Sequence, residues 1–455
     1  MRVVIIGAGP TGLGAAYRLQ ELGHTDWQMY EASDHVGGLA ASVTSNGFVY
    51  DTGGHVMFSH YEYFDRLVER LLGDEYTEIA RDSSIRLRGR YVPYPFQNNV
   101  RHLDPEALLE CVLGLAKRRM RPEDAANFQE WIHAVFGDGI ARLFMEPYNW
   151  KVWAHPLHLM DKQWIAERVA VVDLETTLRS VIFDEPEMPW GPNSTFKFPL
   201  RGGTGGLYER FLPYVERRLS LESAVAEIDP VRKNIRLENG LEDRYDVLLS
   251  TMPVNELVTR MQSVPARVRT AARQLSWSSA LFVGIGVARR LETDRCWIYY
   301  PEDNCPFYRI TYLSRYSPYM APDGEHFSII TETSASQWKV EDRHTIVERT
   351  IEGLIATGAL EETDRARIVD RTLIEAEYAY PTPTIERDFA LAIIQPYLME
   401  QGIFSRGRFG AWLYEIGNMD HSVMQGVEFV NHVLAGDPET TWIAPRRRIV
   451  AESLT

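Results

Sequence analysis

The sequence is poor in cysteine and lacks long apolar runs. Its three cysteines, Cys111, Cys296 and Cys305, fit neither a zinc site nor a paired disulfide framework. No stretch of about 18 uncharged apolar residues offers a transmembrane helix. Glycines interrupt the apolar residues 3–13, and no basic segment precedes them, which argues against a signal peptide. We therefore expect a cytoplasmic protein in a reducing compartment, with no membrane partner and no metal site.

Positive charge is also scarce. Lys and Arg number 48 against 63 Asp and Glu, so the formal net charge is −15 at pH 7. An acidic surface repels nucleic acid and anionic membranes, so neither is an expected partner. A small anionic ligand is still compatible with this charge, because a few local arginines can hold it. With 455 residues and 45% hydrophobic residues, the chain is predicted to form two to four globular units.

The N-terminal segment carries a dinucleotide-binding fingerprint. The β-branched run Val3–Ile6 predicts a buried parallel strand, and the turn GAGPTG follows it at residues 7–12, before a helical pattern that ends at Gly23. A second strand at 27–30 ends in Glu31. In this setting the glycines bring the backbone close to a pyrophosphate, and the acidic residue accepts hydrogen bonds from a ribose. The fingerprint glycines are Gly7, Gly9 and Gly12.

Further glycine-rich loops favour FAD over a nicotinamide cofactor. The pair Gly37-Gly38 comes soon after Glu31, residues 201–206 form another glycine loop, and Gly417 begins a further segment. Such loops allow the backbone to pack against an isoalloxazine ring, and the pattern resembles FAD-binding oxidoreductases. FAD is therefore the predicted cofactor.

The remaining patterns predict an interleaved α/β fold. Residues 104–180 show helical periodicity, whereas strand patterns occur at 224–228, 234–237 and 247–250 and again within 281–333. No internal repeat and no long linker separates these regions. The predicted fold is a Rossmann-type FAD-binding domain interleaved with a helical domain and an antiparallel-sheet domain.

The expected domain boundaries follow these patterns along the chain. They are 1–90 for the first part of the FAD-binding domain, 91–190 for a mainly helical substrate domain, 191–265 for FAD-binding and sheet segments, 266–400 for an antiparallel-sheet substrate domain, and 401–455 for the returning FAD-binding segment.

Seven further motifs stand in one order along nearly the whole chain. They are DTGGHVMFSHY (51–61), VPYPFQNN (92–99), FMEPYNWKVW (144–153), WGPN (190–193), PEDNCPFYR (301–309), YPTPT (380–384) and SRGRFGAWLYE (405–415). Together they resemble the UDP-galactopyranose mutase family, and its fungal and protozoan branch more than its bacterial branch. The segment after Tyr316 is shorter than in fungal relatives, and Met419 stands where the fungal pattern usually has glutamine. The oligomeric state therefore stays open.

The resemblance implies a reaction without net redox change. The family interconverts UDP-galactopyranose and UDP-galactofuranose, so these are the implied substrates. Attack of reduced FAD N5 on the anomeric carbon displaces UDP, after which the sugar ring opens and recloses. NADPH is implied only as the reductant that makes the flavin active.

The resemblance also implies a set of substrate-binding residues. Arg168 and Arg309 are expected to bind the pyrophosphate, and both are also implied to be catalytic, because they stabilise charge on the departing UDP. Hydroxyls reaching the same phosphates are implied for Tyr299, Tyr380 and Tyr414. The resemblance implies that Tyr94 and Gln97 bind the uracil ring. The rest of the pocket is assigned to Phe144, Asn149, Trp153, Asn193 and Arg408; of these, periodicity alone places Phe144, Asn149 and Trp153 in a helix core.

The third implied catalytic residue is His55, which follows a glycine pair and is expected to lie beside the flavin. Its implied role is to respond to flavin reduction through the loop, more than to act as a general acid or base. The implied FAD-binding residues are Gly7, Gly9, Thr11, Gly12, Glu31, Gly38, Leu39, Gly53, Gly54, Val225, Arg408, Gly417, Asn418 and Ser422.

Three alternative functions remain open from the sequence. One is a mutase for another nucleotide sugar, since a few pocket contacts separate sugar epimers. Another is an FAD-dependent amine or protoporphyrinogen-type oxidase, which would not need an arginine pair for phosphate. The third is a non-catalytic binding module like the dissociation inhibitors of prenylated GTPases, against which the intact glycine fingerprint and Glu31 argue.

Overall fold

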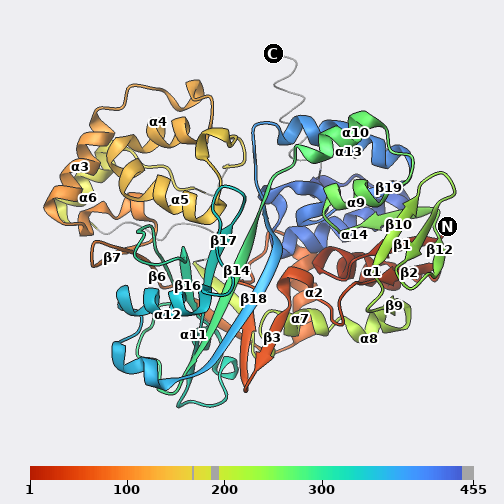
Figure 1. Cartoon of the computed structure of the whole chain (residues 1–455), viewed down its shortest axis with the longest axis horizontal. Coiled ribbons are helices and arrows are strands. Elements are labelled where there is room, and N and C mark those ends of the chain that lie inside the picture. The colour runs from red at the N-terminus through yellow and green to blue at the C-terminus, as the bar shows by residue number, and fades with distance from the viewer. Residues whose placement is uncertain (166–168, 186–193, 443–455) are drawn as a thin grey trace.

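A five-stranded parallel sheet forms around the N-terminal strand in the computed structural model, which describes residues 1–165, 169–185 and 194–442. The strand order is β19-β13-β1-β2-β9. In chain order these are β1 (Val3–Ile6), β2 (Trp27–Tyr30), β9 (Leu219–Ser220), β13 (Val247–Ser250) and β19 (Ile403–Ser405). The sheet therefore joins segments that lie far apart in the sequence (Figure 1).

Helices cover both faces of this sheet. Val3 and Ile5 of β1 pack in one core with α1 (Pro10–Glu21) and α14 (Met419–Ala435). The alternate side chains of β1 pack in a second core with α9 (Val254–Arg260), α10 (Ala266–Arg273) and α13 (Arg387–Glu400). This doubly wound arrangement confirms the predicted Rossmann-type unit.

The second large sheet has seven strands and is mostly antiparallel. Its order is β18-β14-β17-β16-β15-β6-β7, and β15 and β6 form its parallel pair. The strands are β6 (Ser83–Leu87), β7 (Arg90–Pro93), β14 (Trp277–Val287), β15 (Trp297–Tyr299), β16 (Arg309–Tyr312), β17 (Phe327–Ala335) and β18 (Ile368–Pro381). The sheet thus takes two strands from the early part of the chain and five from the expected 266–400 segment.

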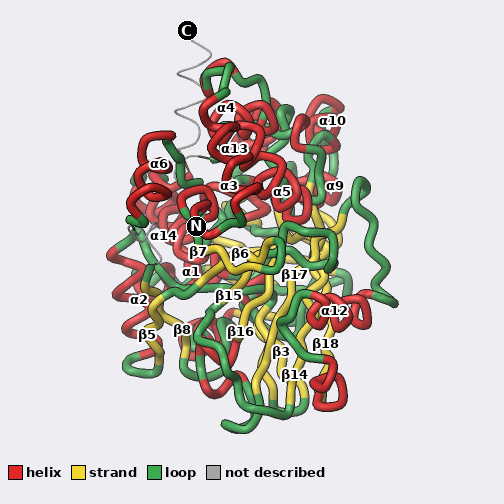
Figure 2. The backbone as a smooth tube through the Cα atoms, turned by 90° about the vertical axis from the view of Figure 1, so that its left-hand side faces the viewer, coloured by secondary structure: helices red, strands yellow, loops and turns green. Residues whose placement is uncertain are grey.

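A helical unit lies over β6 and β7, as the two views agree (Figures 1 and 2). It contains α3 (Pro105–Ala116), α4 (Phe128–Ile140), α5 (Glu146–Trp153) and α6 (Leu174–Phe183), with the π-helical segment η5 (Ala141–Met145) leading into α5. Asp104, Asn127 and Asp173 cap α3, α4 and α6 by accepting hydrogen bonds from backbone N–H groups. The helices confirm the helical pattern predicted for 104–180.

The remaining elements connect these units. They are β3 (Ser42–Ser45), β4 (Phe48–Asp51), α2 (Glu62–Leu72), β5 (Tyr76–Ala80), β8 (Thr195–Pro199), α7 (Gly205–Glu209), α8 (Leu212–Val215), β10 (Val225–Asp229), β11 (Asn234–Leu237), β12 (Glu242–Arg244), α11 (Leu313–Tyr316) and α12 (Ile346–Ala356). Among the described residues, no helix is long and apolar enough to cross a membrane. Cys111, Cys296 and Cys305 are all buried and free.

Candidate active site

The fingerprint turn has the close backbone approach that its glycines predict. Gly7 has φ +97°, and a Cβ on Gly12 would lie 1.9 Å from the Gly7 carbonyl oxygen. Glu31 follows β2, and its carboxylate accepts hydrogen bonds from the backbone N–H groups of Ala8 (2.6 Å) and Ser33 (2.9 Å). The acidic residue therefore lies directly against the turn, where a ribose would meet it.

A second glycine pair lies against the first. Gly37 and Gly38 have φ +105° and +53°, and a Cβ on Gly38 would lie 3.3 Å from the Cα of Gly9. Leu39 follows in a short 3₁₀ segment and packs between the second core of the parallel sheet and the core of the large sheet. Glycine backbone thus surrounds the N-terminus of α1. This is the close, uncrowded cradle that a dinucleotide requires.

The returning C-terminal segment closes over this cradle. Gly407 (φ +86°) approaches Thr11 so closely that a Cβ there would lie 2.5 Å from the Thr11 hydroxyl oxygen. Arg408 donates a hydrogen bond from Nη1 to the carbonyl of Gly417 (3.1 Å). Asn418 is the N-cap residue of α14, and Ser422 is buried one turn further on. Val225, the first residue of β10, is buried in the second core of the parallel sheet.

The loop Gly53-Gly54-His55 follows β4 and lies against the large sheet. Gly53 has φ +94°, and a Cβ on Gly54 would lie 2.5 Å from the Thr311 hydroxyl oxygen. The Gly54 N–H donates to Glu332 (3.1 Å), and its carbonyl accepts from Arg309 Nη2 (3.4 Å). The large sheet therefore holds this loop through its backbone, so the position of His55 depends on the Arg309–Glu332 pair.

His55 is uncharged at neutral pH. Burial and then the nearby charge of Arg408 lower the pKa of its imidazole to about 4. Its Nδ1 atom is buried and has no hydrogen-bond partner among the described residues. A buried ring nitrogen without a partner fits a site that a polar cofactor or substrate atom completes.

Glu332 organises the site and was not among the residues predicted from the sequence. It faces Arg309 in the register of β16 and β17 and accepts hydrogen bonds from Arg309 Nε (2.6 Å) and Nη2 (2.9 Å) and from the Tyr308 hydroxyl (2.7 Å). Burial raises the pKa of Glu332, but Arg309 and Tyr308 outweigh it and keep the pKa below its usual range. An acidic residue inside the buried strand FSIITETSA was the signal that could have identified it.

Tyrosine rings form one wall of the site. Tyr94 and Tyr299 have ring centroids 5.6 Å apart, and Tyr148 lies 5.3 Å from Tyr299. Tyr299 is also the register partner of Arg309, so strands β15, β16 and β17 bring Tyr299, Arg309 and Glu332 side by side. Tyr148 was not predicted, although it stands in the same motif as Asn149.

The opposite wall carries Arg408. Its guanidinium lies 5.0 Å from the ring centroid of Tyr380 and 5.5 Å from that of Tyr414, which is a cation–π arrangement. Trp153 packs edge-on against both tyrosines, at 5.9 Å and 4.9 Å. The Tyr380 hydroxyl lies 3.0 Å from the Tyr308 hydroxyl, which links this wall to Glu332.

Three predicted substrate residues make internal contacts in this structure. Gln97 donates its amide to the Ala170 carbonyl (2.7 Å), and Asn149 donates to the Met145 carbonyl (2.7 Å). Phe144 stacks between Phe96 (4.7 Å) and Tyr148 (5.1 Å). The contacts of Asn149 and Phe144 agree with the helix-core placement that periodicity favours, and the ligand roles of all three residues stay predictions. Arg168 and Asn193 lie outside the described residues.

One group of side chains in the described part of the chain has the composition of a metal site. It consists of His60, Asp420 and His421. The two imidazole rings stack with centroids 4.9 Å apart and planes 12° apart. His60 Nδ1 bonds to Asp420 (2.7 Å), and His421 Nδ1 bonds to the Tyr61 hydroxyl (2.7 Å). These hydrogen bonds connect residues 60 and 61 to the first turn of α14.

The family of the chain follows from its match to known proteins. Residues 10–404 match the flavin containing amine oxidoreductase family, and the chain belongs to that family. FAD is therefore its cofactor, in agreement with the glycine cradle and the unpartnered His55 nitrogen. Among solved structures, a reduced UDP-galactopyranose mutase is 43% identical, with a TM-score of 0.94 over 98% of this chain and 96% of that one.

More distant relatives share the fold or a short segment. A putative protoporphyrinogen oxidase from Exiguobacterium sp. 255-15 is 18% identical with a TM-score of 0.73, covering 96% of this chain and 99% of that one, which shows the fold alone. Protoporphyrinogen oxidase 2 of Arabidopsis thaliana is 43% identical over 56 residues, and polyamine oxidase 1 of Zea mays is 41% identical over 54 residues. Each match covers 12% of this chain and 11% of the curated relative.

Proposed function

We propose that this chain is a UDP-galactopyranose mutase, which interconverts UDP-galactopyranose and UDP-galactofuranose. The observation that carries the proposal is the similarity to a solved mutase over nearly the whole length of both chains, at 43% identity. The convergence of His55, Arg309, Arg408 and the tyrosines of both walls on one place beside the FAD cradle is consistent with it. When bound and reduced, FAD supplies the nucleophile through N5, and the reaction has no net redox change.

The protein's own groups bind and orient the nucleotide sugar in this proposal. Arg309 is already held by Glu332, so its guanidinium meets the pyrophosphate in a fixed orientation and stabilises the charge that develops on the leaving UDP. The hydroxyls of Tyr299, Tyr380 and Tyr414 donate to the same oxygens. Tyr94 covers the uracil ring by stacking.

His55 contributes as a neutral side chain. Its low pKa keeps it uncharged, so it can hydrogen-bond to the flavin without competing with Arg309 or Arg408 for anionic oxygens. Because Gly54 is bonded to Glu332 and Arg309, pyrophosphate binding and the position of His55 are coupled through one backbone unit. The relation to the fungal and protozoan branch, NADPH as reductant and a cytoplasmic location remain predictions from the sequence.

The direct test is incubation of UDP-galactofuranose with dithionite-reduced protein, followed by chromatography for UDP-galactopyranose. We expect conversion in the reduced sample and none in an oxidised sample. Equal conversion by oxidised protein would contradict the nucleophilic role of the flavin. No conversion by reduced, FAD-loaded protein would contradict the proposed substrate.

Substitution of the phosphate-binding arginine tests the site. Arg309→Ala is expected to weaken UDP binding by about 100-fold, because the charged contact from the part of the guanidinium not bound to Glu332 is lost, while FAD remains bound. Titration calorimetry with UDP and the flavin absorbance spectrum measure the two effects. Arg315→Ala is the matched control, since this exposed arginine pairs with Asp294. Unchanged UDP affinity in Arg309→Ala would remove Arg309 from the site.

A further inference from the structure

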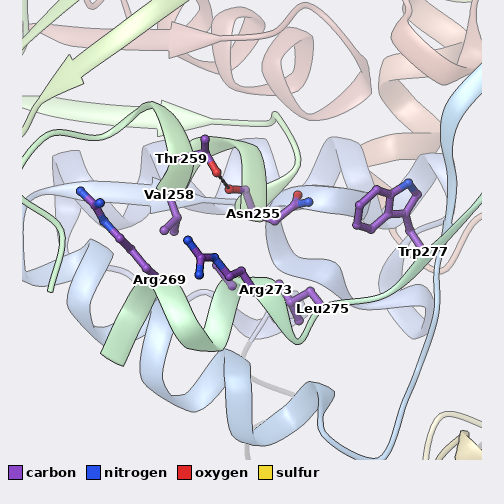
Figure 3. Close-up of a pocket in the computed structure, with 8 residues that line it drawn as sticks. Asn255, Val258, Thr259, Arg269, Arg273, Leu275 and Trp277 are labelled. Atoms are coloured by element: carbon purple, nitrogen blue, oxygen red, sulfur yellow. Dashed lines mark hydrogen bonds between the residues drawn. The ribbon is translucent and has the colours of Figure 1, made fainter. Parts of the chain in front are cut away.

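A pocket of about 340 Å³ lies between α9, α10 and the start of β14. Figure 3 shows its lining residues, with Arg269 and Arg273 at one side and Trp277 at the far end. None of these residues belongs to the predicted FAD or sugar site. The pocket therefore needs an explanation of its own, and its size falls within the usual range for small-molecule sites.

The pocket concentrates positive charge in an acidic protein. Arg269 and Arg273 stand four residues apart on α10, so they share one helix face, and both guanidinium groups reach toward α9 (Figure 3). No carboxylate among the described residues lies within ion-pair distance of either side chain. Glu256, the acidic residue of α9, already binds Arg260 and the Tyr378 hydroxyl. The two cations are thus available to an anionic ligand.

The other end of the pocket offers an aromatic face and an acceptor. Trp277 stacks on Tyr378 with centroids 4.8 Å apart and planes 21° apart, which fixes the indole ring. Asn255 donates its amide N–H to the Tyr378 hydroxyl (3.0 Å), and this orients its side chain. The Asn255 Oδ1 atom is buried and has no hydrogen-bond partner among the described residues. It is an acceptor that a ligand hydroxyl or amine can satisfy.

We propose that this pocket is a second nucleotide-binding site. The phosphate groups bind Arg269 and Arg273, whose planar guanidinium groups match phosphate oxygens. A ribose hydroxyl or base amine donates to Asn255 Oδ1, and the base packs on Trp277. Cations at one end, an aromatic ring at the other and an unsatisfied acceptor between them correspond to the three parts of a nucleotide.

Calorimetric titration of the FAD-loaded protein with UDP tests the site. We expect two binding events in the wild type, one at the active site and a weaker one at this pocket. The double variant Arg269→Ala/Arg273→Ala is expected to lose the weaker event, with affinity reduced about tenfold or more, and to keep the other. The variant Arg309→Ala is expected to show the reverse. A failure of the proposed active site and a failure of this pocket therefore give different isotherms.

Arg267→Ala is the matched control, because Arg267 is exposed on the same helix but does not line the pocket. Equal weakening by Arg267→Ala would show general charge attraction and overturn the proposal, as would a single binding event in the wild type. Uridine and inorganic pyrophosphate separate the contributions. Pyrophosphate should compete for the weaker site in the wild type and uridine much less. UDP binding at the weaker site that survives loss of both arginines with full affinity would overturn the assignment of the phosphates to Arg269 and Arg273.

Discussion

Two side chains of the site, His55 and Glu332, have properties that depend on their neighbours more than on their identity. His55 is neutral because it is buried near Arg408, and Glu332 is charged because Arg309 and Tyr308 bind it. In isolation both groups titrate near their ordinary values. Their altered pKa values therefore give measurable dependences on pH and on ligand.

His55 should make the protein less stable in acid. Its pKa is about 4 in the folded state against 6.5 in the unfolded chain, so the unfolded state binds more protons between these values. Stability is unaffected above pH 6.5 and falls as the pH drops toward 4, by an amount on the order of 3 kcal/mol. Urea unfolding of wild type and His55→Asn at pH 7.5 and 5.0 measures this effect. A fall of the same size in the variant would assign it to other groups.

Removing the charge of Glu332 should make stability depend on the nucleotide. Glu332→Gln keeps the shape of the side chain but leaves Arg309 without its counter-charge, which we expect to cost about 3 kcal/mol. Bound UDP then supplies the missing negative charge. UDP should therefore raise the thermal unfolding midpoint of the variant more than that of the wild type. An equal shift in both proteins would indicate that the pyrophosphate does not meet Arg309.

At the scale of elements, the helix α5 and the β15–β16 hairpin both carry residues of the site, and a buried lysine connects them. Lys151 is 3% exposed, and its Nζ donates to the carbonyls of Glu302 (2.9 Å) and Cys305 (3.0 Å) and lies 3.4 Å from the Cys305 sulfur. These acceptors belong to the turn between Tyr299 and Arg309. The lysine thus holds the turn against the helix that carries Tyr148 and Trp153.

Lys151→Met should weaken the contact between α5 and the turn that contains Glu302 and Cys305. The substitution keeps the apolar stem but leaves two carbonyls without a donor, which we expect to cost about 2 kcal/mol and to raise KM for the nucleotide sugar more than it lowers kcat. Urea unfolding and steady-state kinetics measure the two effects. Lys162→Met is the control, because Lys162 also donates to two carbonyls, those of Pro122 and Glu123, but at the protein surface. Similar losses in both variants would contradict a special role for Lys151.

At the scale of the whole molecule, the cofactor cradle is assembled from both ends of the chain. The fingerprint turn and the Gly53-Gly54 loop belong to the first 55 residues, and Gly407 of the C-terminal segment lies against Thr11 although about 400 residues separate them in the sequence. A ligand that bridges them stabilises the folded chain by binding only the native state.

Removal of FAD should therefore lower the stability of the entire chain. At a free FAD concentration about 100 times the Kd, the loss amounts to about 2.7 kcal/mol. Thermal unfolding of holoprotein, apoprotein and FAD-reconstituted apoprotein, followed by far-UV circular dichroism, measures it. Full recovery on reconstitution is expected. An unchanged midpoint in the apoprotein would mean that the three segments are held together without the cofactor.

The sequence by itself determined the strand–turn–helix at residues 3–21, the Glu31 position and the helices within 104–180. These features depend on local patterns of apolar residues, glycines and capping side chains, which act over a few positions. The domain boundaries, which followed from the helix and strand patterns, stay predictions, and so do most ligand roles, which followed from the resemblance.

Only the tertiary structure decided the pairing of Arg309 with Glu332, the neutrality of His55 and the burial of Lys151. Arg309 and Glu332 meet because β16 and β17 align in one register, and Lys151 meets its carbonyls across two separate units. Such contacts arise when burial removes water from groups that are distant in the chain, so charge, pKa and hydrogen-bonding partners are set by the folded environment and not by the local sequence.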